Sequence, residues 1–497
     1  MSPPFAKVLI ANRGEIAVRV IRGCHELGIR TVAVFSEADR SALHVRNAGE
    51  AYAIGAAPSS ESYLRGERVI DAARRSGAAA IHPGYGFLSE NADFARMVQD
   101  AGLTWIGPPP DAIDAMGSKT GARQRMIAAG VPVVPGTAEP IATEAEALAI
   151  ARGMGFPVML KAAAGGGGKG MRRVDREEDF GSAWRSARSE AARSFSDDAV
   201  YLEKFVENPK HVEIQVLADH HGTTVHLFER DCSVQRRNQK VVEETPCPVL
   251  PDEIRQAMAK VAVQAAEAVG YQGAGTIEFL YSQASRQFHF LEMNTRLQVE
   301  HPITEAVTGI DLVRAQLRVA SGERLWFAQR DVRQVGHAVE CRVYAEDPAN
   351  DFAPAPGRIS GLREPGGPWV RVDSGVYAGY EVPIHYDPMI AKLVCWGADR
   401  AEAISRSIRA LREYRVRGIR TSIPFFGALL RDPDFLAGTY STGLLSPERM
   451  ARLAQGTRNE RIAVIAASLA QFEADHRPTR PAGRARASAW KLAGRPA

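Results

Sequence analysis

The sequence predicts a protein of mixed α/β and α+β class, with a parallel-sheet unit first, a larger central unit and a smaller α+β unit last. Three observations support this prediction. Residues 7–35 follow a strand–helix–strand pattern, which is typical of a parallel sheet. The central part holds a glycine-rich run at 161–170 and a hairpin pattern at 276–293. After about residue 330, segments rich in Pro and Gly separate short strands from one helix.

The composition indicates about three domains, because 497 residues suffice for several hydrophobic cores. The net charge of +4 is small and spread along the chain, which argues against nucleic acid as a partner. The five cysteines form no CxxC pair, and their odd number argues against a disulfide framework, so a reducing, cytoplasmic setting is expected. Neither a signal peptide nor an apolar run long enough for a membrane span is indicated, so no membrane partner is expected.

The N-terminal unit is predicted from a buried strand at Lys7–Ile10, a helix at Glu15–Leu27 and a second strand at Thr31–Phe35. The turn between the first strand and the helix invites a dinucleotide-binding interpretation. That turn has one glycine, whereas the pyrophosphate fingerprint needs three. A Rossmann-like scaffold without a dinucleotide is therefore the better prediction.

The remaining elements follow from periodicity and from turn residues. A boundary at Gly107–Pro110 precedes a helical segment that extends to about Gly130. Ser446 is predicted to cap a helix that starts at Pro447, and the Pro-, Arg- and Ala-rich stretch from Arg477 is expected to be flexible. The other predicted helices are 176–194, 252–269 and 401–414. The other predicted strands are 158–161 and 171–174 on either side of the glycine run, the hairpin 276–281 with 287–293, and then 337–344 and 416–421. The strands 200–205, 211–217 and 224–229 are predicted to belong to a mixed sheet.

The glycine run at residues 161–170 suits a polyphosphate, because consecutive glycines let several backbone N–H groups point at one anion. The run is not a Walker A loop, because Ala163 stands where that loop needs a glycine and Gly170 stands where it needs Ser or Thr. The GxGxxG pattern matches, but a strand follows it rather than a helix. The prediction is a hairpin tip that closes over nucleotide phosphates, with Lys161 on the entering strand and Lys169 in the loop. A plain flexible linker is the alternative.

Residues 292–300 read Glu-Met-Asn-Thr-Arg-Leu-Gln-Val-Glu, and every even position is polar. This period of two predicts a β-strand with one buried face and one polar face. A solvated surface strand shows the same alternation, so the pattern alone leaves both interpretations open. The polar groups that could hold a metal ion and an anion side by side are Glu292, Asn294, Arg296, Gln298 and Glu300.

Two neighbouring segments favour the functional interpretation. Glu278 lies on the strand predicted to pair with the one that carries Glu292, and with Asn294 these residues form an all-oxygen site suited to Mg²⁺. Each glutamate alone also fits a solvated surface. The basic strip Gln235–Lys240 has no interleaved aromatic residues, so a small anion beside the nucleotide is favoured over nucleic acid or a merely solvated face.

With these motifs, the chain resembles biotin carboxylase, the ATP-grasp component of acetyl-CoA and related acyl-CoA carboxylases. The resemblance runs from Lys7 to about Pro447. Its most specific segments are Ala11–Ala17, His82–Asn91, the glycine run and Glu292–Pro302. It implies a Rossmann-like domain at 1–114, an ATP-grasp domain at 115–330 with a mobile lid at about 134–204, a C-terminal α+β domain at 331–447, and a helix with a basic tail at 448–497.

The resemblance also implies residue roles by position. The implied ATP contacts are Lys119, Lys161, Gly167, Gly168, Glu203, Lys204, Val206, His211, Glu278 and Glu292. The implied ligands of Mg²⁺ or Mn²⁺, expected as two ions, are Glu278, Glu292 and Asn294. The implied bicarbonate pocket is Lys240, Arg296, Gln298 and Val299. Glu300 matches the general base and Arg342 the residue that steadies the biotin enolate, so the implied catalytic set is Arg296, Glu300, Lys240 and Arg342.

In the implied reaction, Glu300 deprotonates bicarbonate, which then attacks the γ-phosphate of ATP. The resulting carboxyphosphate gives CO₂ and phosphate in a closed site, and the biotin enolate attacks CO₂. One position departs from the pattern: Asn238 stands where bacterial acetyl-CoA carboxylases often have histidine. A different ATP affinity is therefore expected, while the chemistry is expected to be retained.

The expected partners are separate chains. No Met-Lys-Met motif occurs, and Lys491 lacks the flanks of a biotinyl site, so biotin is expected on a carrier protein and the carboxyltransferase on a further chain. A homodimer is expected from the family. The tail with Trp490 is interpreted as an overhang or a docking segment. The alternatives are the biotin carboxylase subunit of a two-subunit pyruvate carboxylase, another ATP-grasp ligase, or a non-catalytic regulatory protein. The sequence does not name the acyl acceptor.

Overall fold

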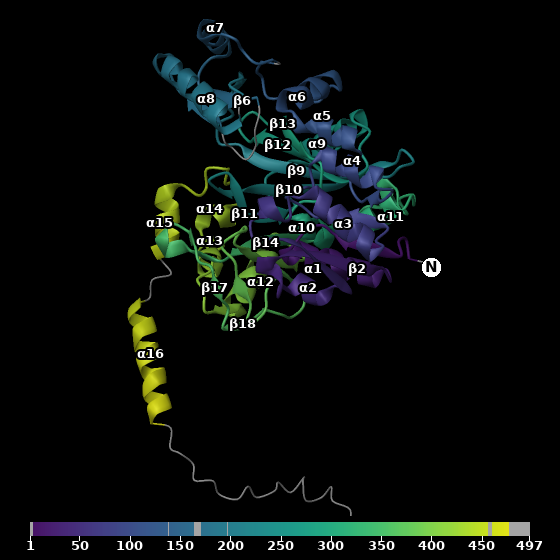
Figure 1. Ribbon diagram of the computed structural model, residues 1–497. Coiled ribbons are helices and arrows are strands. Elements are labelled where there is room, and N and C mark those ends of the chain that lie inside the picture. Colours follow the sequence, from purple (N-terminus) through teal and green to yellow (C-terminus); the bar gives the residue numbers. More distant parts are fainter. Residues whose placement is uncertain (1–2, 138, 164–169, 196, 456–459, 477–497) are drawn as a thin grey trace, which may run out of the picture.

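The computed structural model describes residues 3–137, 139–163, 170–195, 197–455 and 460–476. The predicted strand–helix–strand opening is confirmed, because helix α1 (Gly14–Glu26) connects two adjacent parallel strands (Figure 1). Val8, Leu9 and Ile10 are fully buried, as expected for the centre of a sheet that is covered on both faces. The order of this five-stranded parallel sheet is β3 (Glu50–Gly55), β2 (Arg30–Ser36), β1 (Lys7–Ile10), β4 (Ala80–His82) and β5 (Thr104–Trp105).

The largest sheet has eight strands, and all of its pairings are antiparallel. The mixed sheet predicted for the central strands is therefore wrong. Short hairpins connect several neighbouring strands here, whereas a parallel pair needs a long crossover. One hairpin turns at Arg237 and Asn238, which both adopt positive φ. The sheet order is β13 (Gln287–Asn294), β12 (Gly273–Ser282), β9 (Lys210–Ala218), β10 (Thr224–Arg236), β11 (Gln239–Thr245), β14 (His337–Tyr344), β21 (Met389–Gly397) and β19 (Val370–Ser374).

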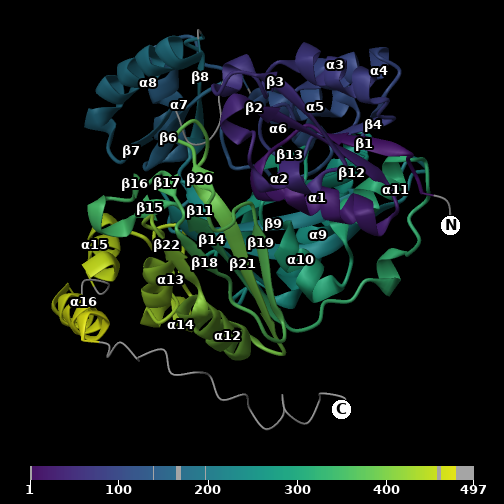
Figure 2. The same cartoon turned by 60° about the horizontal axis from the view of Figure 1, so that its bottom comes forward.

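The eight-stranded sheet runs through the predicted domain border near residue 330. Strand β11 pairs with β14, with Val242 opposite Cys341 and Thr245 opposite Ala338. This pairing satisfies an edge of β11 that would otherwise be open. Helices α12 (Arg400–Glu413) and α13 (Ile423–Leu429) pack near this end of the sheet (Figure 2). The central and C-terminal segments therefore share one sheet, and side chains from both reach the same cavity.

A smaller unit with its own core lies beside this sheet, at the top of Figure 1. Its strands are ordered β7 (Met171–Val174), β6 (Val158–Ala162) and β8 (Val200–Lys204), and α7 (Glu144–Met154) and α8 (Phe180–Phe195) cover them. Strands β6 and β7 are antiparallel neighbours, so the glycine run connects a hairpin as predicted. The tip, which includes Gly167, Gly168 and Lys169, lies outside the described residues.

Several predicted helix and strand limits change. The segment up to Gly130 divides into α5 (Pro110–Gly117) and α6 (Lys119–Ala128), because the Ser118 Oγ accepts a hydrogen bond from the Gly121 N–H at 3.2 Å and starts a new helix. The strand predicted at 416–421 is only β22 (Arg415–Arg417). The Ser446 cap is confirmed, since its Oγ accepts from the Arg449 N–H at 3.2 Å at the start of α15 (Pro447–Gln455).

Helix α16 (Glu460–Asp475) lies apart from the rest of the molecule in Figure 1. The predicted tail from Arg477 onward, with Trp490 and Lys491, falls outside the described residues. Within the described part of the chain, no helix combines the length and the apolar character that crossing a membrane requires.

Candidate active site

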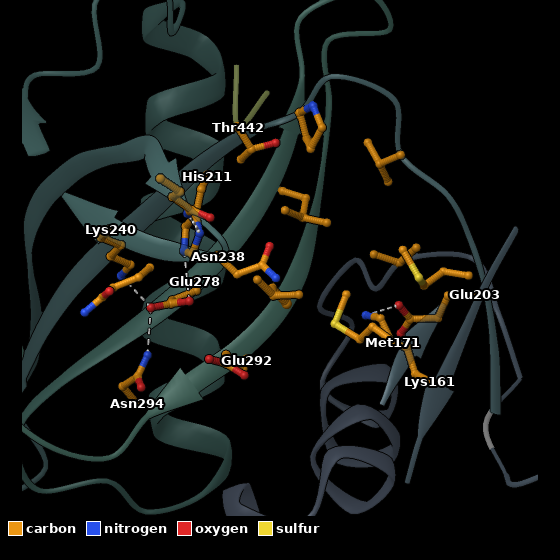
Figure 3. Close-up of a pocket in the computed structure, with 18 of the residues that line it drawn as sticks. Lys161, Met171, Glu203, His211, Asn238, Lys240, Glu278, Glu292, Asn294 and Thr442 are labelled. Carbon is orange, nitrogen blue, oxygen red and sulfur yellow. Dashed lines mark hydrogen bonds and ion pairs between the residues drawn. The ribbon is translucent and has the colours of Figure 1, made fainter. Parts of the chain in front are cut away.

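A cavity of about 550 Å³ lies between the eight-stranded sheet and the β6–β8 unit (Figure 3). Among the residues predicted for the site, Lys119 is the first residue of α6, and Gly167 and Gly168 lie outside the described residues. All other predicted site residues line this one cavity: Lys161, Glu203, Lys204, Val206, His211, Lys240, Glu278, Glu292, Asn294, Arg296, Gln298, Val299, Glu300 and Arg342.

The predicted strand across 292–300 is wrong in its second half. Strand β13 ends at Asn294, and residues 295–300 form a loop before helix α10 (His301–Thr308). The apolar side chains of this stretch pack in two different cores: Met293 in the core behind β12 and Leu297 in the core of the N-terminal unit. Gln298 and Glu300 are buried in spite of their polarity, at 3% and 1% exposure. The loop therefore passes between two hydrophobic cores and places these polar side chains in the cavity.

The loop is anchored by the His82–Asn91 motif. The Glu90 Oε2 accepts from the Arg296 Nε at 2.8 Å, and its Oε1 accepts from the Thr295 N–H at 3.1 Å. Burial alone lowers the pKa of Arg296, but Glu90 and the nearby carboxylates raise it above its ordinary value. Arg296 also donates to the Asn294 Oδ1 at 3.0 Å. The guanidinium is therefore fixed at the cavity wall as a permanent positive charge.

The cavity's most concentrated charge is around Lys240 on β11, whose side chain reaches carboxylates on β9 and β12 of the same sheet (Figure 3). Its Nζ donates to the Glu213 Oε2 at 2.5 Å, the Glu278 Oε1 at 2.8 Å and the Glu300 Oε1 at 2.7 Å. Burial lowers the pKa of Lys240, but Cys232 and the carboxylates outweigh this effect and hold the pKa well above its usual value. Lys240 therefore stays positively charged and holds three buried carboxylates together.

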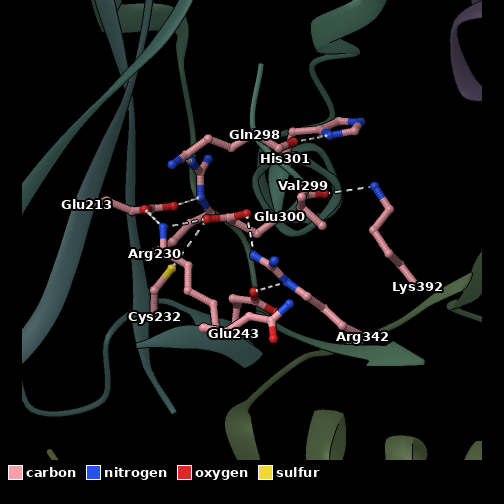
Figure 4. Close-up of polar contacts among 12 residues, drawn as sticks. Glu213, Arg230, Cys232, Glu243, Gln298, Val299, Glu300, His301, Arg342 and Lys392 are labelled. Carbon is pink, nitrogen blue, oxygen red and sulfur yellow. Dashed lines mark hydrogen bonds and ion pairs between the residues drawn. The ribbon is translucent and has the colours of Figure 1, made fainter. Parts of the chain in front are cut away.

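Glu300 bridges two cations (Figure 4). Besides the Lys240 contact, its Oε2 accepts from the Arg342 Nη2 at 2.8 Å, while the Arg342 Nε donates to the Glu243 Oε1 at 2.6 Å. Burial raises the pKa of Glu300, but Lys240, Arg342 and Arg230 outweigh it and keep the pKa well below its usual range. Glu300 is therefore ionised at neutral pH, which is the protonation state that a base requires.

Sequence reasoning missed Arg230 and Glu213. Arg230 is completely buried and donates to the Glu213 Oε1 at 2.6 Å and the Gln298 Oε1 at 2.7 Å (Figure 4). It also donates to Gln215, Thr276 and Thr304, so its guanidinium fixes Gln298 from behind. The sequence feature that could have indicated Arg230 is Glu229-Arg230-Asp231, three consecutive charged residues inside a strand with apolar flanks.

Lys161 and Glu203 lie across the cavity, on β6 and β8 (Figure 3). The Lys161 Nζ is 2.5 Å from the Glu203 Oε2, and Arg123, which was also missed, donates to the Glu203 Oε1 at 3.2 Å. The Lys204 ammonium turns away to donate to the Gly155 carbonyl at 2.8 Å. Glu203, Lys204, Phe205 and Val206 all line the cavity on this side.

The proposed metal ligands share one face of a strand pair. Glu278 on β12 is directly opposite Glu292 on β13, and the Asn294 Nδ2 donates to the Glu278 Oε1 at 2.8 Å. The His211 Nε2 lies 2.8 Å from the Glu278 Oε2. Burial raises the pKa of Glu278, but Lys240 and His211 outweigh it and hold the pKa well below its usual value. Two carboxylates and an amide oxygen on one wall of the cavity fit Mg²⁺ or Mn²⁺.

Three family models together match most of the chain: "Biotin carboxylase, N-terminal domain" at residues 4–113, "Carbamoyl-phosphate synthase L chain, ATP binding domain" at 118–327 and "Biotin carboxylase C-terminal domain" at 340–447. A biotin carboxylase from Nostoc sp. is 54% identical over 441 residues, covering 89% of this chain and 98% of that protein. A pyruvate carboxylase subunit from Methanothermobacter thermautotrophicus is 53% identical over 445 residues, covering 90% of each chain.

A solved structure of similar fold is the biotin carboxylase domain dimer of Hydrogenobacter thermophilus 2-oxoglutarate carboxylase, described in complex with MgADP, ADP and bicarbonate. The TM-score is 0.86 at 47% identity, and the match covers 90% of this chain and 98% of that one.

Proposed function

The chain belongs to the biotin carboxylase family, and we propose from its geometry how each part of the cavity serves that family's reaction. The protein is a ligase, a biotin carboxylase that uses ATP. The observation that carries the residue assignment is the Lys240 cluster. It places an ionised carboxylate, Glu300, between two fixed cations at the end of the loop that carries Gln298 and Val299.

The wall formed by β6 and β8 is the proposed ATP-binding wall. Glu203, Lys204 and Val206 are the proposed adenine contacts, and Lys161 is the proposed phosphate contact. Lys119, Gly167 and Gly168 are proposed to complete the phosphate contacts, and His211 contacts the nucleotide from β9. The Lys161–Glu203 pair supports this assignment, because a nucleotide phosphate can replace Glu203 as the anionic partner of the lysine.

Glu278, Glu292 and Asn294 are the proposed ligands of the Mg²⁺ or Mn²⁺ that accompanies ATP. Such an ion neutralises negative charge on the phosphates during transfer. The residues of this chain make a separate contribution, since Lys240 and His211 keep Glu278 ionised and oriented before the nucleotide binds.

The loop at 296–300 with Lys240 is the proposed bicarbonate pocket. Glu300 takes the proton of the bicarbonate hydroxyl, and the oxygen left with the electron pair attacks the γ-phosphorus of ATP, releasing ADP and forming carboxyphosphate. Carboxyphosphate breaks down to CO₂ and phosphate, and phosphate accepts the N1′ proton of biotin. The enolate that results forms the new C–N bond with CO₂, and Arg342 stabilises its negative charge.

The physiological setting is proposed by analogy. The carrier and the carboxyltransferase are separate chains, the protein is a homodimer, and the acceptor is an acyl-CoA or, as for the Methanothermobacter relative, pyruvate. All five cysteines are free and buried, which supports a reducing cytoplasm.

Biotin dependence of ATP hydrolysis tests the function directly. We expect ADP formation to require bicarbonate and to rise several-fold when free biotin or a biotinylated carrier domain is added, because biotin gives its N1′ proton to the phosphate and takes up the CO₂, which clears the site for the next turnover. The measurement is a coupled ADP assay on the full chain. Hydrolysis that is indifferent to both bicarbonate and biotin would contradict the proposal and would favour another ATP-dependent ligase.

Glu292→Gln tests the metal assignment. We expect the Mg²⁺ concentration for half-maximal ATP hydrolysis to rise about tenfold, because the variant loses one anionic ligand. The matched control is Glu229→Gln, a buried carboxylate that pairs with Arg255 at 2.8 Å outside the cavity. An unchanged Mg²⁺ requirement in Glu292→Gln would remove Glu292 from the ligand set.

A further inference from the structure

Lys392 on β21 is completely buried beneath the loop at 296–300 (Figure 4). Its Nζ donates a hydrogen bond to the Val299 carbonyl oxygen at 2.7 Å. The same ammonium lies 3.3 Å from the Glu15 Oε2 and 3.9 Å from the Asp373 Oδ2. Removing an ammonium group from water is expensive, and a neutral donor would satisfy a carbonyl at lower cost. The charge at this position therefore needs a reason beyond the hydrogen bond itself.

The register of the sheet shows how this buried charge is related to the site. Lys392 on β21 stands directly opposite Arg342 on β14, so the two cations are neighbours on adjacent strands. Arg342 donates to the Glu300 carboxylate at 2.8 Å, and Lys392 donates to the carbonyl of the preceding residue. Two adjacent cations therefore hold two consecutive loop residues, one through its side chain and one through its backbone.

Val299 and Glu300 have no strand ladder to hold them, because β13 ends at Asn294. The orientation of the peptide between them decides where the Glu300 carboxylate points. A charge-assisted bond to the Val299 carbonyl fixes that peptide more firmly than a neutral bond would. Negative charge near the ammonium comes from Asp373, whose pKa Arg371 and Lys392 lower against the effect of burial, and in part from Glu15 at the start of α1, whose pKa burial raises to about 7.

We propose that Lys392 is a positioning residue for the carboxylation reaction, which holds the Val299–Glu300 peptide so that bicarbonate and the Glu300 base meet in reactive geometry. This inference rests on the proposed assignment of residues 296–300 to bicarbonate. Lys392 touches neither substrate, and its effect reaches the reaction through Val299. Misplacement of a reacting group by about 1 Å can lower a rate by about a hundredfold, so a lost anchor is expected to have a measurable effect.

The test compares three variants of the full chain. Lys392→Met removes the ammonium and keeps most of the stem volume, whereas Glu15→Gln/Lys392→Met also replaces the carboxyl group nearest to the ammonium and so leaves no unpaired Glu15 in the interior. The matched control is Lys210→Met. Lys210 is also completely buried, pairs with Asp231 at 2.7 Å and donates to the Gly438 carbonyl at 2.9 Å, but does not line the cavity.

We expect the double variant to keep a Tm close to that of the wild type, to lose about tenfold in kcat and to raise the KM for bicarbonate about tenfold, with the KM for ATP within about twofold. The control is expected to lose thermal stability with both KM values unchanged. A double variant with wild-type kcat and wild-type KM for bicarbonate would overturn the inference. If Lys392→Met does not fold, the double variant alone decides the outcome.

The same assay separates this inference from the proposed function. Wild-type protein without bicarbonate-dependent ATP hydrolysis would overturn both. Wild-type activity that is lost in Arg296→Ala but retained in the Lys392 double variant would overturn only the positioning role. A parallel rise in both KM values, proportional to a loss of stability, would also count against positioning, since a merely structural lysine would act on both substrates alike.

Discussion

Replacing Glu300 by glutamine is expected to lower bicarbonate- and biotin-dependent ATP hydrolysis by at least about a hundredfold, while ATP still binds. Glutamine keeps the shape and can still accept hydrogen bonds, but it cannot take the bicarbonate proton, and general base catalysis contributes about 10²–10⁴ in rate. Both cations keep other partners, since Lys240 retains Glu213 and Glu278 and Arg342 retains Glu243. The fold should therefore survive the change.

The measurements for Glu300→Gln are steady-state ADP formation and a direct titration of a nucleotide. The nucleotide Kd is expected within about threefold of the wild type, because Glu300 lies across the cavity from the proposed adenine contacts, and so the loss appears in kcat. Glu229→Gln serves again as the control, with near-normal turnover expected. Near-normal turnover in Glu300→Gln would mean that another group acts as the base, and Glu213 would be the first candidate.

The sequence predicted the cavity's composition better than its geometry. The strand-pair position of Glu278 and Glu292 followed from a recognisable hairpin, and the structure pairs them directly. The loop at 295–300 was missed because alternation over nine residues is satisfied equally by a strand and by a loop between two cores. Leu297 and Met293 look equivalent in the sequence, yet they pack in different clusters. The alternation of polar and apolar residues does not show which hydrophobic core each apolar side chain joins.

The groups that sequence reasoning missed act over long separations. Arg230 contacts Gln298, Glu90 contacts Arg296, and Lys392 contacts Val299, and each pair is separated by more than 60 residues. Local periodicity carries no information on such pairs, and a buried arginine in a strand resembles an exposed one until the sheet is assembled. The partners of the site residues therefore required the structure, whereas most of the site residues themselves did not.

Replacing Lys240 by methionine is expected to destabilise the protein as well as to inactivate it. The ammonium is the shared partner of three buried carboxylates, and removing one side of a buried ion pair costs about 3–5 kcal/mol. For a chain of this size the expected fall in Tm is on the order of 3–5 °C. Glu213→Gln/Lys240→Met should recover part of this loss, because it removes one of the uncompensated negative charges.

The loss of thermal stability in Lys240→Met should depend on pH. In the wild type, the pKa values of Glu278 and Glu300 lie well below their usual range, because Lys240 and the neighbouring cations outweigh the effect of burial. Carboxylates with a lowered pKa contribute stability that is present above the pKa of the unfolded chain and lost as the pH falls through the folded value. Without Lys240 these pKa values rise, so the carboxylates oppose folding wherever they must remain ionised.

The difference in Tm between wild type and Lys240→Met should therefore be largest near pH 8 and shrink toward pH 5, as measured by thermal unfolding of both proteins across that range. An equal difference at both ends would mean that the lysine stabilises the protein through packing of its stem rather than through its charge.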